Sequence, residues 1–288
     1  MTAAAIASMA MTTSCKKDKK DPVITITTQP AATVGIALGG TERLTVAATA
    51  TEGAALTWQW HSNATASNTS GMEIGGATTA NYDLPATLRE GTYYYFCEAR
   101  AQGAVSQRTD VATVTVAGVS IGGVVWATRN VGAPGAFAAN PQDAGMLYQW
   151  DSKIGYLNTG TVASWNTTES AATSWQAAND PSPDGWRVPT VAELEALKAA
   201  PSEWTIVGGA YGRRIGTGAN TIFIPAAGTR YFSTGALENV GERGTVWSNE
   251  QFSVNMDMAI SMDFTSSLSP STTGARKTFA RTIRCVKR

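Results

Sequence analysis

Short runs of β-branched and aromatic residues, separated by polar or glycine-rich stretches, recur along the first 118 residues of the chain. The runs are VITIT, ERLTVAATA, LTWQWHS, TYYYFCEAR and VATVTVAG. Strands of this length and spacing, with turn-forming segments between them, are typical of a two-sheet antiparallel sandwich. The chain is therefore predicted to be mainly β, with a first β domain over residues 22–117.

One of these runs resembles strand F of an immunoglobulin-like domain. Tyr95 precedes Cys97 by two residues, as in a tyrosine corner, and Trp60 matches the core tryptophan of strand C. The partner cysteine of such domains is missing, because Val46 and Ala48 stand where it is expected. The resemblance implies an immunoglobulin-like β-sandwich that serves as a spacer, with Cys97 as a buried free thiol.

The second half of the chain contains a helical signal and an alternating strand. Thr190 and Glu193 have the spacing of a capping box at the start of the run AELEALKAA, and Pro201 follows this run. This pattern predicts a helix over residues 191–199. From 255 to 264, large apolar residues alternate with small or polar ones, which predicts a strand with one buried side and one solvent-facing side.

Several blocks in this half occur in the order and spacing of one family. They are VVWATRNVGAPGAFAANPQDAGMLYQWD, NDPSPDGWRVPTVAELEALK, NTIFIPAAGTR, VWSNE and RTIRCVKR. They resemble the Fibrobacter succinogenes major paralogous domain, whose fold is related to C-type lectins and to formylglycine-generating enzymes. The resemblance implies an α+β C-type-lectin-like domain over residues 119–288, with most tryptophans in its core. The family usually has a cysteine in NDPCPxGW that could pair with the one in RCV, whereas Ser182 stands there and leaves Cys285 without that partner.

Residues 1–21 have the features of a targeting segment. Small and apolar residues fill most of positions 1–14, and Cys15 is followed at once by KKDKKD. This arrangement resembles the signal peptide and lipobox of bacterial lipoproteins. It implies lipidation at Cys15 and a charged tether on the cell surface, anchored in the outer membrane, as in Bacteroides-like bacteria. Thr12 departs from the usual leucine, and a disordered leader with a chance cysteine is the alternative.

Composition and charge narrow the possible functions. Lys and Arg number 22, as do Asp and Glu, so the chain has no basic field for a nucleic-acid backbone. One histidine and three cysteines are too few for a zinc site or for catalysis by paired imidazoles. We expect His61 to lie at the surface, because it follows Trp60 on an alternating strand. No cofactor and no nucleic-acid partner are predicted.

We predict that the chain is not an enzyme. Formylglycine-generating enzymes depend on a reactive cysteine pair, whereas Cys97 and Cys285 fall in different predicted domains. Glycoside hydrolysis needs two carboxylates that face each other across a sugar. Asp257 and Asp263 lie on one predicted strand, roughly 20 Å apart by the strand rise, which is too far for such a pair.

The candidate ligand-binding residues lie near the end of the chain. The stretch Trp247, Ser248, Asn249 and Glu250 is similar to the calcium-binding WND block of sugar-binding C-type lectins, but no EPN or QPD loop accompanies it, and we predict no metal site. In this fold class, ligand contacts tend to lie on the last strands and their loops. The resemblance therefore also implies a binding loop over 265–277, with the candidates Ser266, Ser267, Ser269, Ser271 and Thr272. A calcium site at Asn249 and Glu250, a core strand end and a plain solvated loop are the alternatives.

Together these patterns predict a lipid-anchored cell-surface protein that binds an extracellular glycan or protein through its C-terminal domain. A structural subunit of a surface appendage, such as a fimbrial tip, is one alternative. A carbohydrate-active or modifying enzyme is the other. The identity of the ligand does not follow from any of these patterns.

Overall fold

The computed structural model describes residues 20–288, so the predicted lipidation site at Cys15 lies outside the described residues. The described part of the chain is mainly β, with one α-helix. It divides into two compact units, one of residues 20–32, 44–82 and 94–112, and the other of residues 33–43, 83–93 and 113–288. None of the described helices is both long and apolar enough to cross a membrane.

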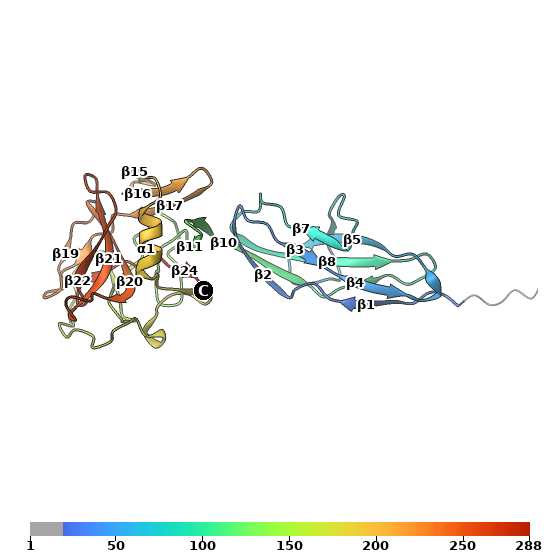
Figure 1. Ribbon diagram of the computed structural model, residues 1–288, viewed down its shortest axis with the longest axis horizontal. Coiled ribbons are helices and arrows are strands. Elements are labelled where there is room, and N and C mark those ends of the chain that lie inside the picture. The colour runs from blue at the N-terminus through green and yellow to red at the C-terminus, as the bar shows by residue number, and fades with distance from the viewer. Residues whose placement is uncertain (1–19) are drawn as a thin grey trace, which may run out of the picture. The chain divides into compact units, whose positions relative to one another are not determined.

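The first part of the chain forms a sandwich of two sheets (Figure 1). One sheet has the order β6 (Met72–Glu73), β5 (Thr57–Asn63), β8 (Gly91–Arg100) and β10 (Ala112–Ile121), with β9 (Gln107–Arg108) on β8 and β2 (Thr33–Leu38) parallel to β10. The other side is built from β1 (Ile24–Thr28) with β4 (Ala47–Ala50), and from β3 (Arg43–Thr45) with β7 (Asn81–Asp83). This pairing is that of an immunoglobulin-like sandwich, so the predicted fold of this part is confirmed.

Trp60 and Cys97 lie in the core of the sandwich. They are paired across β5 and β8, and both are fully buried. The Trp60 ring packs against Tyr82, which in turn contacts Tyr95, with ring centroids 5.8 and 5.6 Å apart. Cys97 is a free buried thiol, as predicted, and burial raises its pKa to about 12.

His61 is buried, so the prediction of a surface histidine is wrong. Only 5% of the residue is exposed, because its ring stacks on Phe96, its cross-strand neighbour, with ring centroids 4.7 Å apart. Its Nε2 atom lies 3.6 Å from a carboxylate oxygen of Glu98. Neither ring nitrogen makes a hydrogen bond within the described residues. Both sides of β5 are therefore covered at this point, and alternation along the strand does not bring His61 to solvent.

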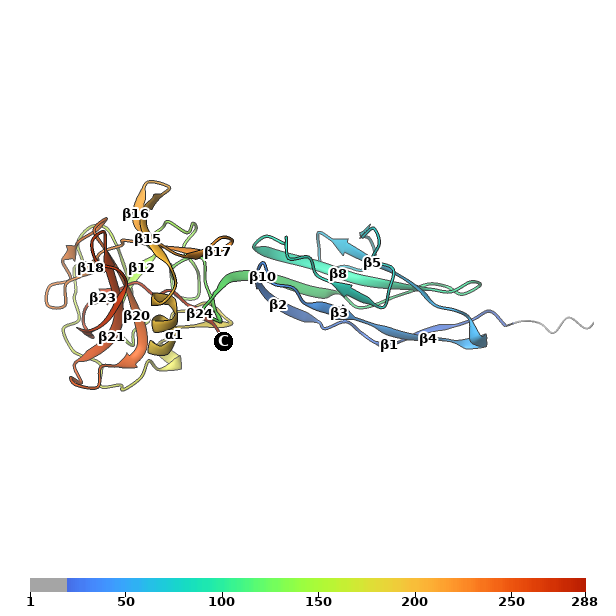
Figure 2. The same ribbon diagram turned by 45° about the horizontal axis from the view of Figure 1, so that its top comes forward.

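The rest of the chain is built from small sheets around one helix (Figure 1). The end of β10 pairs with β11 (Val124–Trp126), which pairs with β24 (Val286–Lys287), and β24 pairs with β14 (Trp186–Arg187). A second sheet has the order β13 (Gly155–Leu157), β12 (Met146–Gln149), β23 (Ala280–Arg281), β18 (Thr229–Arg230) and β19 (Leu237–Glu238). Two meanders complete this part: β15 (Ser202–Val207), β16 (Ala210–Thr217) and β17 (Asn220–Pro225), and β20 (Arg243–Gln251), β21 (Met258–Thr265) and β22 (Ser271–Arg276). Figure 2 shows the β15–β16 hairpin projecting from these sheets.

The helix α1 (Val191–Lys198) forms where the sequence predicts it. The Thr190 side chain accepts a hydrogen bond from the Glu193 N–H, and the Glu193 carboxylate accepts one from the Thr190 N–H, so the predicted capping box is present. Leu194 and Leu197 are its buried residues, and they join the core beside β16, β20 and β21. The apolar stripe and the cap therefore act together, one by packing and the other by satisfying the first N–H groups.

Two large hydrophobic clusters and a smaller one fill the core of this part of the chain. Buried tryptophans contribute to both large clusters: Trp126 to one, and Trp150, Trp175 and Trp186 to the other, as predicted. Trp247, predicted to bind a ligand, is also a member of the second cluster. Trp165 and Trp204 are half-buried. Every fully buried member of the two clusters lies at position 119 or later. The C-type-lectin-like assignment of this part stays a prediction.

β21 differs from the strand predicted over residues 255–264. It spans Met258–Thr265, and Met256 is 68% exposed in the turn before it. Asp263, on the side predicted to face solvent, is buried because Arg281 from β23 covers it and donates hydrogen bonds to its carboxylate. The strand is thus buried on both sides over its second half.

Candidate functional site

Trp247 and Ser248 lie inside the protein, which removes both from the predicted ligand-binding surface. Both are fully buried in β20. The Trp247 indole N–H donates to the Tyr148 carbonyl at 2.8 Å, and the Ser248 hydroxyl donates to the Ile260 carbonyl at 2.8 Å. These hydrogen bonds tie β20 to β12 and β21. The sequence left two interpretations of this pair open, a ligand-binding surface and the end of a core strand, and the burial of both side chains agrees with the second.

Asn249 lines a surface hollow of about 240 Å³. The backbone here is held in place, because the Asn249 N–H donates to Pro189 and the Trp175 N–H donates to Asn249, both at 2.8 Å. The Asn249 side-chain oxygen is buried and has no hydrogen-bond partner within the described residues. An unpaired buried acceptor carries a desolvation cost. The other lining residues are Trp175, Ala177, Asp180, Arg187, Val188 and Arg288.

Trp175 and Arg187 give this hollow an aromatic side and a cationic group. The Trp175 ring contacts Trp150 edge to face at 5.9 Å between centroids, and its indole N–H donates to the Asn179 carbonyl at 3.0 Å. Arg187 holds the Glu193 carboxylate through hydrogen bonds of 2.6 and 2.8 Å, and this hydrogen bonding raises the pKa of Arg187. The guanidinium is therefore fixed beside the hollow rather than free to swing away from it.

Glu250 has a structural partner. Its carboxylate accepts a hydrogen bond of 2.9 Å from the Val191 N–H, the first residue of α1. A carboxylate at this end of a helix is favoured by the helix dipole and satisfies one of the first N–H groups. Within residues 20–288, no group of three or more His, Cys, Asp or Glu side chains could hold a metal ion. The interaction with Val191 accounts for Glu250 without a calcium ion.

The predicted loop over 265–277 is a short turn followed by a strand, which corrects the sequence-based expectation. Ser266, Ser267 and Ser269 are exposed in the turn, whereas Ser271 and Thr272 belong to β22. The turn is held in place by Arg213, which donates to the Thr265 and Leu268 carbonyls at 3.0 and 3.2 Å. The Thr272 hydroxyl donates to the Glu195 carboxylate on α1. Three of the five predicted loop residues are therefore exposed, and they lie on a turn that hydrogen bonds from Arg213 hold in place.

Lys277, the last residue of the predicted loop, is buried. Its ammonium group donates to the carbonyls of Ser170 and Ala172 at 2.9 and 2.8 Å and lies 4.8 Å from the centre of the Trp150 ring. Burial lowers the pKa of Lys277. This lysine ties a long connection, residues 158–176, to the core, so the end of β22 is an anchoring point rather than a loop.

Cys285 and Ser182 meet in the folded chain. The sulfur of Cys285 lies 3.1 Å from the Ser182 hydroxyl, although the two residues are 103 positions apart. Cys285 is a free buried thiol, as predicted, and burial raises its pKa to about 12. At neutral pH this thiol is therefore protonated and a poor nucleophile.

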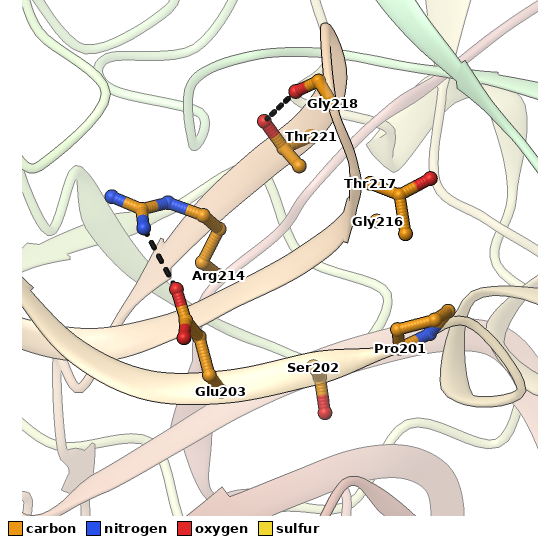
Figure 3. Close-up of a pocket in the computed structure, with 8 residues that line it drawn as sticks. All are labelled: Pro201, Ser202, Glu203, Arg214, Gly216, Thr217, Gly218 and Thr221. Atoms are coloured by element: carbon orange, nitrogen blue, oxygen red, sulfur yellow. Dashed lines mark hydrogen bonds and ion pairs between the residues drawn. The ribbon is translucent and has the colours of Figure 1, made fainter.

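Another hollow, of about 580 Å³, lies on the β15–β17 meander. Figure 3 shows Glu203 and Arg214 pointing toward one another from neighbouring strands, with a hydrogen bond of 2.8 Å between them. Thr217 and Thr221 line it beside the β16–β17 turn, and Thr221 donates to the Gly218 carbonyl at 3.3 Å. Its charged groups satisfy each other and no aromatic residue lines it, so it offers a ligand little beyond its shape.

Sequence reasoning found Asn249 but missed the partners that make it part of a hollow. From the sequence, Trp175 was expected in the core, and Arg187 was noted only as part of the block NDPSPDGWRVPTVAELEALK. No local pattern connects either residue to position 249. They meet because the connection before β14 returns to the end of β20, where Ser174 forms a β-bridge with Glu250. The unpaired oxygen of Asn249 and the Trp175 ring become neighbours only when the chain folds, so no sequence pattern indicates this site.

Known structures similar to this chain contain immunoglobulin-like and fibronectin-like domains. No protein-family model matches the chain, and none of the curated proteins compared matches it. The chain is similar to immunoglobulin domains 1–4 of Sidekick-1, with 17% identity over 35% of this chain and 26% of that one, and a TM-score of 0.28. It is similar to fibronectin(III)-like modules of Clostridium thermocellum CbhA, with 15% identity, 33% and 46% coverage and a TM-score of 0.25. A three-immunoglobulin structure of titin gives 9% identity, 90% and 98% coverage and a TM-score of 0.28. Because these TM-scores are low, the immunoglobulin-like description rests on the strand pairing of the sandwich.

Proposed function

We propose that this chain is a cell-surface binding protein that recognises an extracellular glycan or protein at the hollow around Asn249. The immunoglobulin-like sandwich acts as a spacer, and a lipid on Cys15 anchors the chain in the outer membrane. The observation that carries the proposal is that Asn249, whose side-chain oxygen has no hydrogen-bond partner within the described residues, lines a hollow together with Trp175 and Arg187. Ligand sites combine aromatic surface with a few polar groups that fix orientation, and this hollow has both.

The contact between Ser182 and Cys285 supports the family resemblance on which the C-terminal assignment depends. The resemblance implies a cysteine at position 182 that could pair with Cys285, and the two side chains lie 3.1 Å apart. The capping box at Thr190, inside the block GWRVPT, supports it as well. The contact between Ser182 and Cys285 connects two of the blocks that carry the resemblance, whereas the capping box lies within one of them.

Binding is tested with the full chain on an array of glycans and extracellular-matrix proteins, followed by titration of the strongest hit. Asn249→Leu replaces the amide by an apolar group of the same branched shape. We expect it to weaken binding by about tenfold or more without lowering Tm, because it deletes an unpaired acceptor rather than a hydrogen bond.

The matched control is Ser267→Leu, which adds the same apolar side chain to the exposed β21–β22 turn. We expect this variant to bind like the unaltered chain. Loss of binding in Ser267→Leu with full binding in Asn249→Leu would move the ligand surface to the turn. An array without any hit would contradict the binding function. Concentration-dependent polymerisation of the purified chain would instead favour a structural subunit of a surface appendage.

The lipid anchor has its own test, independent of ligand binding. The full-length protein expressed in a bacterium with a lipoprotein pathway should enter the detergent phase of a phase-separation assay. Cys15→Ser should move it to the aqueous phase, because a single acyl-bearing residue accounts for the anchoring. Equal partitioning of the two proteins would overturn the lipoprotein assignment.

A further inference from the structure

A second hollow, of about 230 Å³, lies where several loops of the C-terminal part meet. Its floor is the buried stretch 225–227 after β17, where Ala226 donates to the Tyr211 carbonyl and accepts from the Gly241 N–H, both at 2.8 Å. The floor therefore has its backbone groups satisfied and presents mainly apolar surface. The lining residues are Gln142, Ala144, Asn158, Gly209, Ala210, Tyr211, Pro225, Ala226, Ala227, Val240 and Gly241, none of which lines the hollow at Asn249.

Tyr211 supplies an aromatic wall that is fixed from behind. The residue is 49% exposed, and its ring stacks on Trp204 with centroids 6.3 Å apart and planes 18° apart. Trp204 in turn contacts Phe264, a core residue, edge to face at 6.4 Å. Because the ring is already held, a ligand that stacks on it has little side-chain motion to freeze.

Gln142 and Asn158 supply side-chain amides to the hollow, and both amides are available to bind a ligand. Neither side-chain amide makes a hydrogen bond within the described residues, and the same holds for the Tyr211 hydroxyl. Gln142 lies against the β15–β16 turn, since a Cβ on Gly208 would come within 2.8 Å of its amide nitrogen. Each amide offers both a donor and an acceptor, so the two side chains can either donate hydrogen bonds to hydroxyl groups or accept them.

No lining residue of this hollow carries a charge, unlike those of the other two hollows. The hollow at Asn249 has Asp180, Arg187 and Arg288, and the one in Figure 3 has Glu203 and Arg214. A charged ligand would lose its hydration here without gaining a counter-charge. The volume is also below the range of about 300–1,000 Å³ usual for drug-sized ligands, so the occupant is small.

We propose that this hollow binds one uncharged pyranose ring. The apolar C–H face of the sugar lies on Tyr211 and the floor residues, and its hydroxyl groups exchange hydrogen bonds with Gln142 and Asn158. This site is distinct from the surface at Asn249 and goes beyond the function proposed for it. An uncharged peptide segment is the competing occupant, because amides and aromatic rings bind peptides too, and the test includes it.

The experiment uses the full chain and monitors tryptophan fluorescence, because Trp204 contacts the Tyr211 ring. Methyl glycosides of glucose, galactose, mannose and N-acetylglucosamine are the neutral probes, glucuronate is the charged one, and N-acetylalanine methylamide is the peptide-like one. We expect at least one neutral glycoside to bind with a Kd on the order of 1 mM, as suits a ligand with so few atoms. Glucuronate and the peptide-like probe should not bind.

Variants locate the binding in this hollow. Tyr211→Ala and Gln142→Leu should each weaken binding of the neutral glycoside by about tenfold, because each removes one aromatic or hydrogen-bonded contact. Asn249→Leu should bind the glycoside normally, which separates this site from the other. Tyr93→Ala, in the immunoglobulin-like sandwich, is the matched control, and Tm values check that all variants fold.

Three results would overturn the proposal. One is the absence of binding by any neutral glycoside at tenfold above the expected Kd. Another is binding that Tyr211→Ala and Gln142→Leu leave unchanged in folded protein. The third is tighter binding of the peptide-like probe or of glucuronate, which would assign the hollow to a different ligand class.

Discussion

The side chains of Ser182 and Cys285 are in contact, but no disulfide can join them because residue 182 is a serine. With the Cys285 sulfur 3.1 Å from the Ser182 hydroxyl, Ser182→Cys should pair with Cys285 under glutathione disulfide. The closed loop of 103 residues would add up to about 4.7 kcal/mol to the free energy of unfolding in the chain-entropy model. Mass spectrometry without reduction checks the bond. Ser182→Ala, which should lose about 1 kcal/mol and form no bond, is the control. Two alkylatable thiols at 182 and 285 after oxidation would show that the geometry is wrong.

His61 should make stability depend on pH near neutrality. Burial lowers its pKa in the folded chain, against the opposing influence of Glu98, while the unfolded chain takes up its proton near pH 6.5. The contribution of neutral His61 to the free energy of unfolding should therefore be fully present above about pH 6.5. The free energy of unfolding should fall as the pH drops below that value. Urea unfolding measured from pH 7.5 downward checks this. His61→Gln should flatten the curve in this range, because His61 is the single histidine. A curve of the same shape in both proteins would refute the assignment.

The β21–β22 turn and the β14 strand should respond very differently to substitution. Lysine at Ser266, Ser267 and Ser269 should change the free energy of unfolding by about 0.5 kcal/mol or less each, because these side chains are exposed. Trp186→Ala should cost about 3–5 kcal/mol, because Trp186 is buried against Phe137. Denaturant unfolding of the variants measures both effects. A large loss from the turn variants would mean that the turn packs against other residues.

The helix and strands were predicted with different success for a physical reason. α1 is specified by residues within one or two turns of each other, namely the cap at Thr190, Glu193 and the leucines of its buried stripe. β21 is specified by what packs on both of its sides. Its alternation predicted a solvent-facing side, but Asp263 is covered and paired with Arg281 and Arg243. A period of two shows which residues share a side, but it does not show whether a second layer covers that side.

Buried cations hold much of the irregular chain of the C-terminal part in place. Arg230, Arg284 and Lys277 are almost fully buried, and each donates mainly to backbone carbonyl oxygens, most of them outside strands and helices. Burial lowers the pKa of Arg284 to about 9, so it stays charged at neutral pH. The carbonyls that accept from these three groups include Leu157, Thr159, Gly160, Gly235, Ala127, Phe223, Ser170 and Ala172. Long stretches without regular structure can therefore carry defined hollows.

The C-terminal part should fold without the sandwich. β10 runs through the predicted boundary at Gly118 without a break, yet all fully buried members of the two core clusters lie at 119 or later. A fragment of residues 119–288 keeps these clusters and is long enough for an independent core. We expect it to unfold cooperatively in urea. A fragment beginning at Thr113, which keeps more of β10, is the comparison. Failure of the shorter fragment and folding of the longer one would move the boundary into β10, and failure of both would mean that the two parts share one core.

The sequence alone determined the mainly β class, the immunoglobulin-like sandwich, the capped helix, most buried tryptophans and the two free thiols, because these depend on neighbouring residues and on hydrophobicity. It also located Asn249. Only the tertiary structure decided that Trp247, Ser248 and His61 are buried, that Ser182 meets Cys285, and that Gln142, Asn158 and Tyr211 line one hollow. These side chains come from segments far apart in the chain. No local period records such meetings, since they depend on how loops pack over sheets once the core has formed.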